Sequence, residues 1–286
     1  MKLILGTANF GTQYGIANDT KKISLNEINK ILTLSKNKVK YLDTASNYKN
    51  AEKIIGSNAN KKNFKIITKL PEIGNKISSI DNFVLKSSKN LKSKQLHTVM
   101  VHSINDLRSK NLIKILSSLN RLKKQKKIKK IGVSVYSENN LLKIIDSSPI
   151  DIVQLPASIF DTRFLKKKIL NRLKKKKIKI FVRSIFLQGV IFLTDYKLQQ
   201  KFKKLSKQII KFKNDFNENK TNMIRYCVNF LYSFKEIDGI IFGVNSAENL
   251  RDIFNCKLSK NLKFDKNKYS IKNKKMLIPY NWHKIK

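Results

Sequence analysis

The amino-acid sequence predicts a (β/α)8 barrel, and three observations lead to it. Short apolar segments recur along the 286 residues, longer amphipathic segments separate them, and no linker rich in proline, glycine or serine divides the chain. Short runs of branched and aromatic residues are typical of parallel strands buried on both faces. Parallel neighbours need a crossover between them, so strands that alternate with helices favour a closed barrel. We therefore expect one barrel domain over residues 1–286.

Eight segments rich in Ile, Val, Leu and Phe are the expected strands. They are Leu3–Leu5, Val39–Leu42, Lys65–Thr68, Thr98–Val101, Ile131–Val135, Asp151–Leu155, Ile178–Val182 and Gly239–Phe242. Between them, apolar residues recur at helical spacing, most clearly over Leu107–Lys127. The pattern fades from Phe254 onward. Residues 257–286 are therefore expected to form a C-terminal segment that lies across one end of the barrel or remains a loose tail.

The formal net charge of +42 has two interpretations. A basic balance this large is typical of proteins that bind nucleic acid or an anionic membrane. However, only seven of the 61 basic residues are arginine, the residue that nucleic-acid readers favour, and the abundance of Asn and Ile fits an AT-rich codon bias. The lysine runs Lys123–Lys130 and Lys174–Lys179 fit solvated ends of helices. We favour the compositional interpretation, so nucleic acid is not an expected partner, and we keep a polyanion-binding barrel as an alternative.

Several absences indicate the compartment. No apolar run approaches the ~18–20 residues of a membrane-spanning helix, and the apolar stretch at the start is too short for a signal peptide. The two cysteines, Cys227 and Cys256, form neither a CxxC motif nor a metal-ligand spacing, so no metal is expected. These features predict a reduced, cytoplasmic protein without a membrane partner.

Three neighbouring strands end in ionisable residues, namely Asp43, Lys69 and His102. Each alone could have a structural role, as a cap, a surface lysine or a buried histidine. In a βα barrel, however, the loops that carry chemistry converge at these strand ends, and three coincidences favour a site. Tyr48, five residues after Asp43, is either part of it or a loop aromatic on its rim.

The chemistry expected of this set is proton transfer. A lysine paired with Asp43 would stay charged and lower the pKa of a nearby phenol, which would make Tyr48 usable near neutral pH. His102 would orient a substrate oxygen. The set contains no nucleophilic serine or cysteine, so the proton transfer must be coupled to another step, and hydride transfer is the natural one. The residues alone do not supply a hydride donor.

Short motifs in a fixed order connect this chain to a known family. They are Leu5-Gly6-Thr7-Ala8-Asn9-Phe10-Gly11, Asp43-Thr44-Ala45 with Tyr48, Glu52 and Ile55-Gly56, Thr68-Lys69, Val101-His102-Ser103, Ile131-Gly132-Val133-Ser134, Val153-Gln154-Leu155, Arg183-Ser184 with Gln188-Gly189, and Phe242-Gly243-Val244-Asn245-Ser246-Ala247-Glu248-Asn249-Leu250. With these motifs, which cover residues 3 to about 255, the sequence resembles the aldo-keto reductases, βα-barrel oxidoreductases that use a nicotinamide cofactor.

The resemblance implies roles for the ionisable residues. Tyr48 matches the general acid that protonates a carbonyl oxygen, Lys69 and Asp43 match the pair that tunes it, and His102 matches the residue that orients the carbonyl.

The resemblance also implies a cofactor site, with NADP favoured and NAD left open. Ser134 and Gln154 match the residues that hold the nicotinamide carboxamide, beside Asp43. Arg183 stands where many members stack a tyrosine on the nicotinamide ring. The other implied contacts are Thr7 and Ala8 in the first loop, Ser184, Phe186, Gln188 and Gly189 around the pyrophosphate, and Gly243, Val244, Asn245 and Asn249 in the last turn.

The last turn, between the eighth strand and a helix, has two further aspects. It would offer free N–H groups and a positive dipole end to a phosphate. Many members grip the 2′-phosphate of NADP with Lys or Arg there, whereas this chain has Gly243 and Asn249, with Arg251 nearby. Asn245 and Glu248 alternatively form a capping pair.

The resulting expectation is an NAD(P)H-dependent reductase of a small-molecule carbonyl compound. A sugar or a sugar derivative is one candidate, because Gly6–Gly15 and Arg183–Gly189 look closest to bacterial reductases associated with surface-sugar biosynthesis. The alternatives are a catalytically idle, nicotinamide-binding regulatory subunit and the polyanion-binding barrel. Tyr280 and Trp282 would either close over the pocket or pack against the barrel wall.

Overall fold

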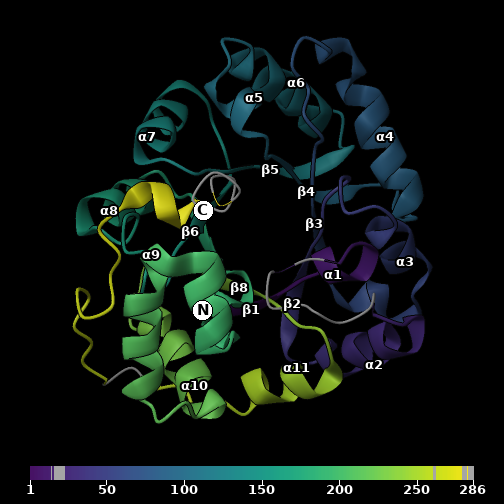
Figure 1. Ribbon diagram of the computed structural model, residues 1–286. Helices are drawn as coiled ribbons and strands as arrows, with labels where there is room; N and C mark the ends of the chain where they lie inside the picture. The colour runs from purple at the N-terminus through teal and green to yellow at the C-terminus, as the bar shows by residue number, and fades with distance from the viewer. Residues whose placement is uncertain (14, 16–22, 260–261, 279–281, 283–286) are drawn as a thin grey trace.

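Eight parallel strands close into a barrel in chain order, in a computed structural model that describes residues 1–13, 15, 23–259, 262–278 and 282 (Figure 1). The strands are β1 (Lys2–Gly6), β2 (Val39–Asp43), β3 (Lys65–Lys69), β4 (Leu96–Val101), β5 (Ile128–Ser134), β6 (Ile152–Pro156), β7 (Lys179–Arg183) and β8 (Gly239–Gly243). The first and last strands close the ring, with Lys2 opposite Gly239 and Gly6 opposite Gly243. The predicted fold class is confirmed.

Helices surround the strands on the outside. They are α1 (Ala8–Gly11), α2 (Leu25–Ser35), α3 (Ala51–Ser57), α4 (Ile80–Asn90), α5 (Ile104–Arg108), α6 (Leu112–Lys124), α7 (Glu138–Ser147), α8 (Lys167–Lys175), α9 (Asp195–Asn214), α10 (Lys220–Tyr232) and α11 (Ala247–Phe254). Short 3-10 helices lie at η1 (Ala59–Asn63), η2 (Ile77–Ser79), η3 (Leu187–Phe192) and η4 (Lys274–Leu277). No helix in the described part of the chain is long and apolar enough to cross a membrane.

The core has two layers because successive side chains of a strand point to opposite faces. The layer inside the barrel is a separate cluster of seven buried side chains, Ile4, Tyr41, Ile67, Met100, Ile152, Phe181 and Ile241. The larger layer lies between the strands and the apolar faces of the helices. Since the barrel interior is filled, a ligand can be accommodated only at an end of it.

The two largest differences from the sequence-based boundaries concern β5 and one predicted helix. Strand β5 begins at Ile128, three residues before the predicted start, so part of a lysine run belongs to a strand. The predicted helix Leu107–Lys127 is two helices, because the chain is extended at Ser109 between α5 and α6. Both α6 and α8 are followed by a lysine in the left-handed region, Lys126 (φ 59°) and Lys177 (φ 57°), where glycine is the usual residue.

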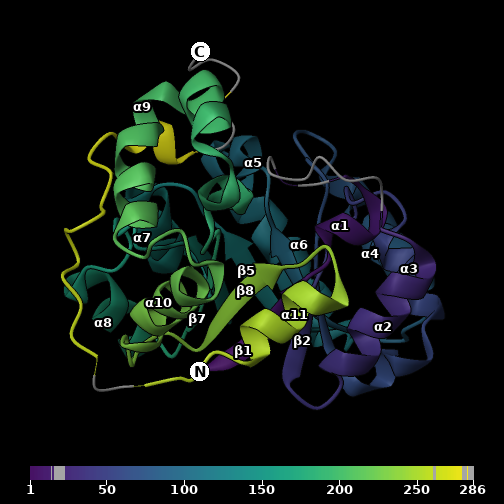
Figure 2. The same cartoon turned by 60° about the horizontal axis from the view of Figure 1, so that its bottom comes forward.

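The C-terminal segment packs along the outside of the barrel and reaches the cavity at its end, where Ile278 is a lining residue. It runs from the barrel end that carries the N-terminus along the side of α8, α9 and α10 (Figure 2). Tyr269 is buried and donates a hydrogen bond to Asp215 (2.6 Å), and Met276 is buried as well. Trp282 packs against Phe202 of α9 and donates to the Met276 carbonyl oxygen (2.7 Å), so it lies on the wall and not over the pocket. Tyr280 lies outside the described residues.

Candidate active site

One cavity of about 890 Å³ opens at the carboxyl ends of the strands. Every residue that the sequence nominated for catalysis or cofactor binding lines it. These residues are Thr7, Ala8, Asp43, Tyr48, Lys69, His102, Ser134, Gln154, Arg183, Ser184, Phe186, Gln188, Gly189, Gly243, Val244, Asn245 and Asn249. The barrel therefore brings together residues from nearly the whole chain.

A buried ion pair lies at the centre of the cavity floor. Lys69 Nζ is 2.7 Å from Asp43 Oδ2 and donates a second hydrogen bond to the Thr44 carbonyl oxygen (2.8 Å). Asp43 Oδ1 accepts a hydrogen bond from the Gln154 amide. The side chains of Lys69 and Asp43 are only 2% and 8% exposed. Burial lowers the pKa of Lys69, and the Asp43 carboxylate opposes that shift.

Tyr48 reaches the cavity from the loop between β2 and α3. Gly11 in α1 makes this possible, since a Cβ at that position would lie 1.8 Å from the Tyr48 carbonyl oxygen. The Lys69 ammonium is 5.4 Å from the centroid of the Tyr48 ring.

The expectation of a lowered pKa for this phenol is wrong. Burial raises the pKa of Tyr48, the Asp43 carboxylate and Tyr136 raise it further, and Arg183 opposes them. The charge of Lys69 is largely balanced by Asp43, so burial dominates. Tyr48 therefore keeps its proton at neutral pH and is suited to donate it.

His102 is neutral at physiological pH and pairs with a tyrosine that sequence analysis missed. Burial, followed by the charges of Lys69 and Arg183, lowers the pKa of His102 to about 3. Its Nε2 lies 3.2 Å from the Tyr136 hydroxyl. Tyr136 also lines the cavity. The sequence could have indicated Tyr136 by its position. It follows Ser134, a cavity-lining residue at the end of β5, by two residues, and side chains two apart along an extended chain point to the same side.

Arg183, the last residue of β7, lines the cavity and connects β7 to the end of β5. Its guanidinium donates to Ser134 Oγ (3.2 Å) and to the Val135 carbonyl oxygen (3.1 Å), and it lies 4.5 Å from the centroid of the Tyr136 ring. No carboxylate among the described residues forms an ion pair with it. Arg183 therefore contributes an unneutralised positive charge to the cavity.

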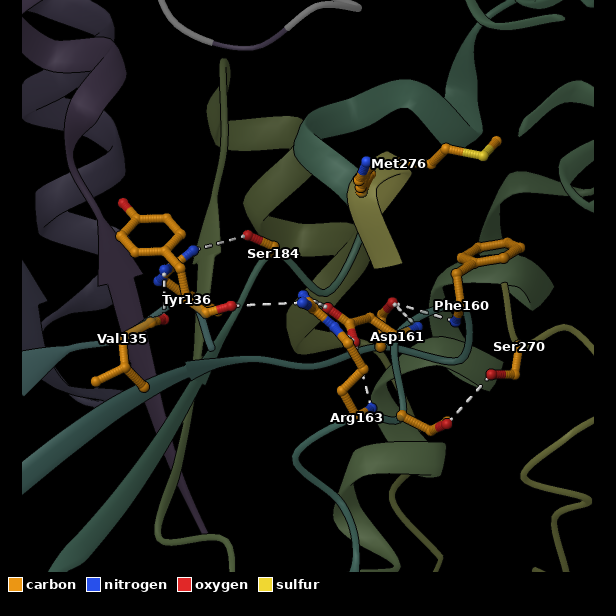
Figure 3. A network of polar contacts seen from close by, with 12 residues as sticks. Val135, Tyr136, Phe160, Asp161, Arg163, Ser184, Ser270 and Met276 are labelled. Carbon is orange, nitrogen blue, oxygen red and sulfur yellow. Dashed lines mark hydrogen bonds and ion pairs between the residues drawn. The ribbon is translucent and has the colours of Figure 1, made fainter. Parts of the chain in front are cut away.

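A second arginine fixes the loop that carries Tyr136 (Figure 3). Arg163 donates to the Tyr136 carbonyl oxygen (3.4 Å) and binds both carboxylate oxygens of Asp161, through Nε at 2.8 Å and a terminal nitrogen at 2.7 Å. Both side chains of this ion pair are at least nine-tenths buried. The bidentate ion pair holds Arg163 in place within the loop after β6, and the hydrogen bond to the Tyr136 carbonyl oxygen joins that loop to the one after β5.

Two features fit a nicotinamide nucleotide. The amide oxygen of Gln154 is fully buried and accepts no hydrogen bond from the protein, so it is available to a carboxamide N–H. Gly243 faces open space at the cavity wall, with no atom within 4 Å of where a Cβ would stand, so a ligand can approach its backbone closely.

The turn between β8 and α11 differs from the sequence-based expectation. Ser246, and not the pair Asn245 and Glu248, caps α11 by accepting a hydrogen bond from the Asn249 N–H (3.1 Å). Asn245 instead accepts a hydrogen bond from the Asn9 amide. The predicted cap at Asn245 is therefore wrong, and the cap lies one residue later.

The cavity at the carboxyl ends of the strands gathers a phenol, an ion-paired lysine and a neutral imidazole, a set that can transfer a proton to a substrate oxygen. Comparison with known proteins gives the class: the profile of the Aldo/keto reductase family matches residues 2–273, and the chain belongs to that family.

Solved structures share the fold at low sequence identity. An aldo-keto reductase from Bacillus halodurans, solved in its holo form, has a TM-score of 0.70 at 16% identity, over 94% of this chain and 90% of its own. A thermostable aldo-keto reductase solved with the inhibitor epalrestat has a TM-score of 0.69 at 18% identity, over 93% and 92%. A putative aldo-keto reductase from Pseudomonas aeruginosa has 0.66 at 16%, over 89% and 87%. Among curated protein sequences, none matches this chain.

Removing one partner of the central ion pair is expected to destabilise the protein. In Asp43→Asn the buried Lys69 ammonium loses its counter-charge, so the free energy of unfolding should fall by about 3 to 5 kcal/mol. Urea unfolding followed by circular dichroism measures this, and the double variant Asp43→Asn/Lys69→Met should recover more than half of the loss.

The exposed pair Asp81 and Arg121 is the matched control. Asp81→Asn should cost less than about 1 kcal/mol because solvent screens that pair. If Asp43→Asn and Asp81→Asn lowered the free energy of unfolding equally, the buried central pair would contribute no more to stability than an exposed one.

Proposed function

We propose that this protein is an NAD(P)H-dependent reductase that converts an aldehyde or ketone to an alcohol, with Tyr48 as general acid. The observation that carries the proposal is the convergence of Tyr48, the Lys69–Asp43 pair and His102 on one cavity with the unpartnered amide oxygen of Gln154. Membership of the Aldo/keto reductase family supports the same reaction class.

Each side chain has a role that its surroundings support. Bound nicotinamide nucleotide supplies the hydride. Tyr48, whose pKa is raised, donates its proton to the carbonyl oxygen as negative charge develops there. The Lys69 ammonium, 5.4 Å from the Tyr48 ring, then stabilises the phenolate left behind. Asp43 holds Lys69, and neutral His102 orients the carbonyl by a hydrogen bond.

The substrate side of the cavity supports a hydroxyl-bearing carbonyl compound. Glu72, Ser103 and Asn105 line this side, and the Glu72 carboxylate accepts hydrogen bonds from both Ser103 (2.8 Å) and Asn105 (2.9 Å). A rim of fixed donors and acceptors suits a polyhydroxylated substrate such as a sugar or a sugar derivative. A screen of aldehydes, ketoses and aldoses with both reduced nucleotides tests this substrate class.

Replacing the phenol should remove turnover but leave nucleotide binding. Tyr48→Phe keeps the ring and loses the proton donor, so kcat should fall by about 10²- to 10⁴-fold while the Kd of the reduced nucleotide changes less than about twofold. Stopped-flow absorbance and fluorescence titration measure the two quantities.

The exposed Tyr196 supplies a control, since Tyr196→Phe should leave both constants unchanged. Unaltered turnover in Tyr48→Phe would refute the general-acid assignment. A wild-type protein that binds nucleotide but reduces no carbonyl compound would favour the idle regulatory subunit.

The pH profile of reduction should lack a histidine inflection. His102, with its pKa lowered to about 3, is neutral throughout the working range, and Tyr48 with its raised pKa stays protonated. Reductive kcat at saturating substrate should therefore be flat from about pH 5 to about pH 9. An inflection near pH 6.5 that disappears in His102→Gln would contradict this.

A further inference from the structure

The barrel end that carries the N-terminus, opposite the cavity, has one lysine from each odd-numbered strand (Figure 2). Lys2, Lys65 and Lys179 are the first residues of β1, β3 and β7, and Lys130 is the third residue of β5. Lys130 and Lys179 are also the last residues of the two lysine runs in the sequence, so both runs end within strands. We call these four residues the lysine layer.

Strand register places Lys65 and Lys179 on the inner face of the barrel. Lys65 lies opposite Tyr41 of β2, and Lys179 lies opposite Ile152 of β6. Both partners belong to the interior cluster. Residues opposite one another on neighbouring parallel strands share a face of the sheet. The two lysines therefore lie on the face that lines the barrel interior, at its amino end.

The other two lysines occupy the equivalent positions of their strands. Lys130 lies opposite Thr98, which precedes the interior residue Met100 by two positions. Lys2 precedes the interior residue Ile4 by two positions, and β1 pairs with β8 without a register shift. Interior layers of a βα barrel take their side chains from alternate strands. The four lysines therefore form one layer around the barrel axis.

The members of the lysine layer are close enough to repel one another. Partial loss of hydration and then the charges of Lys40, Lys129 and Lys179 lower the pKa of Lys65. The same loss of hydration and then the charge of Lys179 lower the pKa of Lys130, which Lys65 lowers further. Ammonium groups on different sides of the barrel thus act on one another, and positive charge is concentrated at its amino end.

The nearest acids are engaged by other lysines. Asp151 pairs with Lys123 (2.6 Å), and Asp238 pairs with Lys174 (3.1 Å). Asp151 opposes the lowered pKa of Lys130 but forms no ion pair with it. Within the described part of the chain, no member of the lysine layer is ion-paired to a carboxylate. The repulsion is therefore not balanced by the protein itself.

His97 of β4 lies within the field of the same lysines. Burial and then the charges of Lys65, Lys130 and two further lysines lower the pKa of His97 to about 4. The imidazole packs edge-on against the Tyr41 ring, with 5.6 Å between the ring centroids. Tyr41 belongs to the interior cluster, so the lysine layer lies next to an aromatic floor. His97 is consequently a built-in reporter of charge at this end of the barrel.

We propose that the lysine layer is a binding site for a compact oligophosphate, on the barrel axis at the end opposite the cavity. A lysine ammonium is a compact charge with three donors, and it is a common ligand of phosphate. Lysines that converge on an axis from four strands fit a compact anion, whereas the backbone of a nucleic acid needs an extended basic stripe. A bound anion would also relieve the repulsion within the layer. The proposal does not depend on the reductase activity.

Calorimetric titration of the full-length protein with inorganic tripolyphosphate tests the proposal. At about 150 mM salt, where the long-range field of the +42 charge is screened, one ion should bind per chain, and more tightly than pyrophosphate or phosphate. Lys65→Gln/Lys179→Gln should weaken binding by at least about tenfold, because it removes two facing charges. Lys86→Gln/Lys89→Gln on the exposed side of α4 removes the same net charge and should change the Kd less than about twofold.

Adenosine triphosphate in the same titration identifies the source of the phosphate chain. Tighter binding of tripolyphosphate indicates a free inorganic ligand, and tighter binding of adenosine triphosphate indicates a nucleotide. Either result supports the proposal if the affinity is lost in Lys65→Gln/Lys179→Gln and kept in Lys86→Gln/Lys89→Gln.

Nuclear magnetic resonance of the imidazole groups locates the bound ion. Tripolyphosphate should raise the pKa of His97, because it offsets the lysine charges that lower this pKa, and should leave the signals of His102 at the other barrel end unchanged. Shifts at His102 without shifts at His97, absence of saturable binding, or equal losses in the two double variants overturn the proposal.

Thermal unfolding without added anion checks the repulsion and the folding of the variant. Lys65→Gln/Lys179→Gln should have a Tm at least as high as that of the wild type, because two mutually repelling charges are gone. A lower Tm would contradict the repulsion on which the proposal rests.

Discussion

The buried contact between Asp43 and Lys69 is the interaction on which the site depends. Two opposite charges at the ends of neighbouring strands can lie 2.7 Å apart only if the strands are parallel and in register, with Asp43 opposite Ile67 two residues before Lys69. Their burial is costly unless each is satisfied by further polar groups. Gln154 from the far side of the barrel and the Thr44 carbonyl provide these groups, so closure of the barrel and satisfaction of the pair require each other.

The same pair sets the chemistry of its neighbours. Because Asp43 balances Lys69, burial is left to raise the pKa of Tyr48, and the phenol keeps its proton. Burial keeps His102 neutral, and the charges of Lys69 and of Arg183, which has no carboxylate partner among the described residues, lower its pKa further. A protonated phenol beside a neutral imidazole can donate and orient without change over a wide range of pH.

The sequence was informative where chemistry follows from strand position. The alternation of short apolar segments with longer amphipathic ones predicted all eight strands. The residues at the strand ends pointed to Asp43, Lys69 and His102, because the βα loops of a barrel converge at one end. It was uninformative where an outcome depends on competing contacts between distant segments. The pKa of Tyr48 depends on burial that no spacing reveals, and the contacts of Tyr136 in the site are with His102, 34 residues earlier in the chain, and with Arg183.

The β8–α11 turn shows that the net charge of the chain does not predict the local charge of the cavity wall. A chain of +42 would be expected to favour the more anionic ligand, yet recognition at close range depends on the groups within a few ångströms. At this turn the cavity-lining residues Gly243, Val244, Asn245 and Asn249 are uncharged, and behind them the Ala247 N–H donates to the Glu27 carboxylate at 2.6 Å. The lysines act through a screened field, whereas Glu27 acts through contact. A count of charges along the chain therefore does not give the charge at any one place on the cavity wall, because contacts such as this one join segments 220 residues apart.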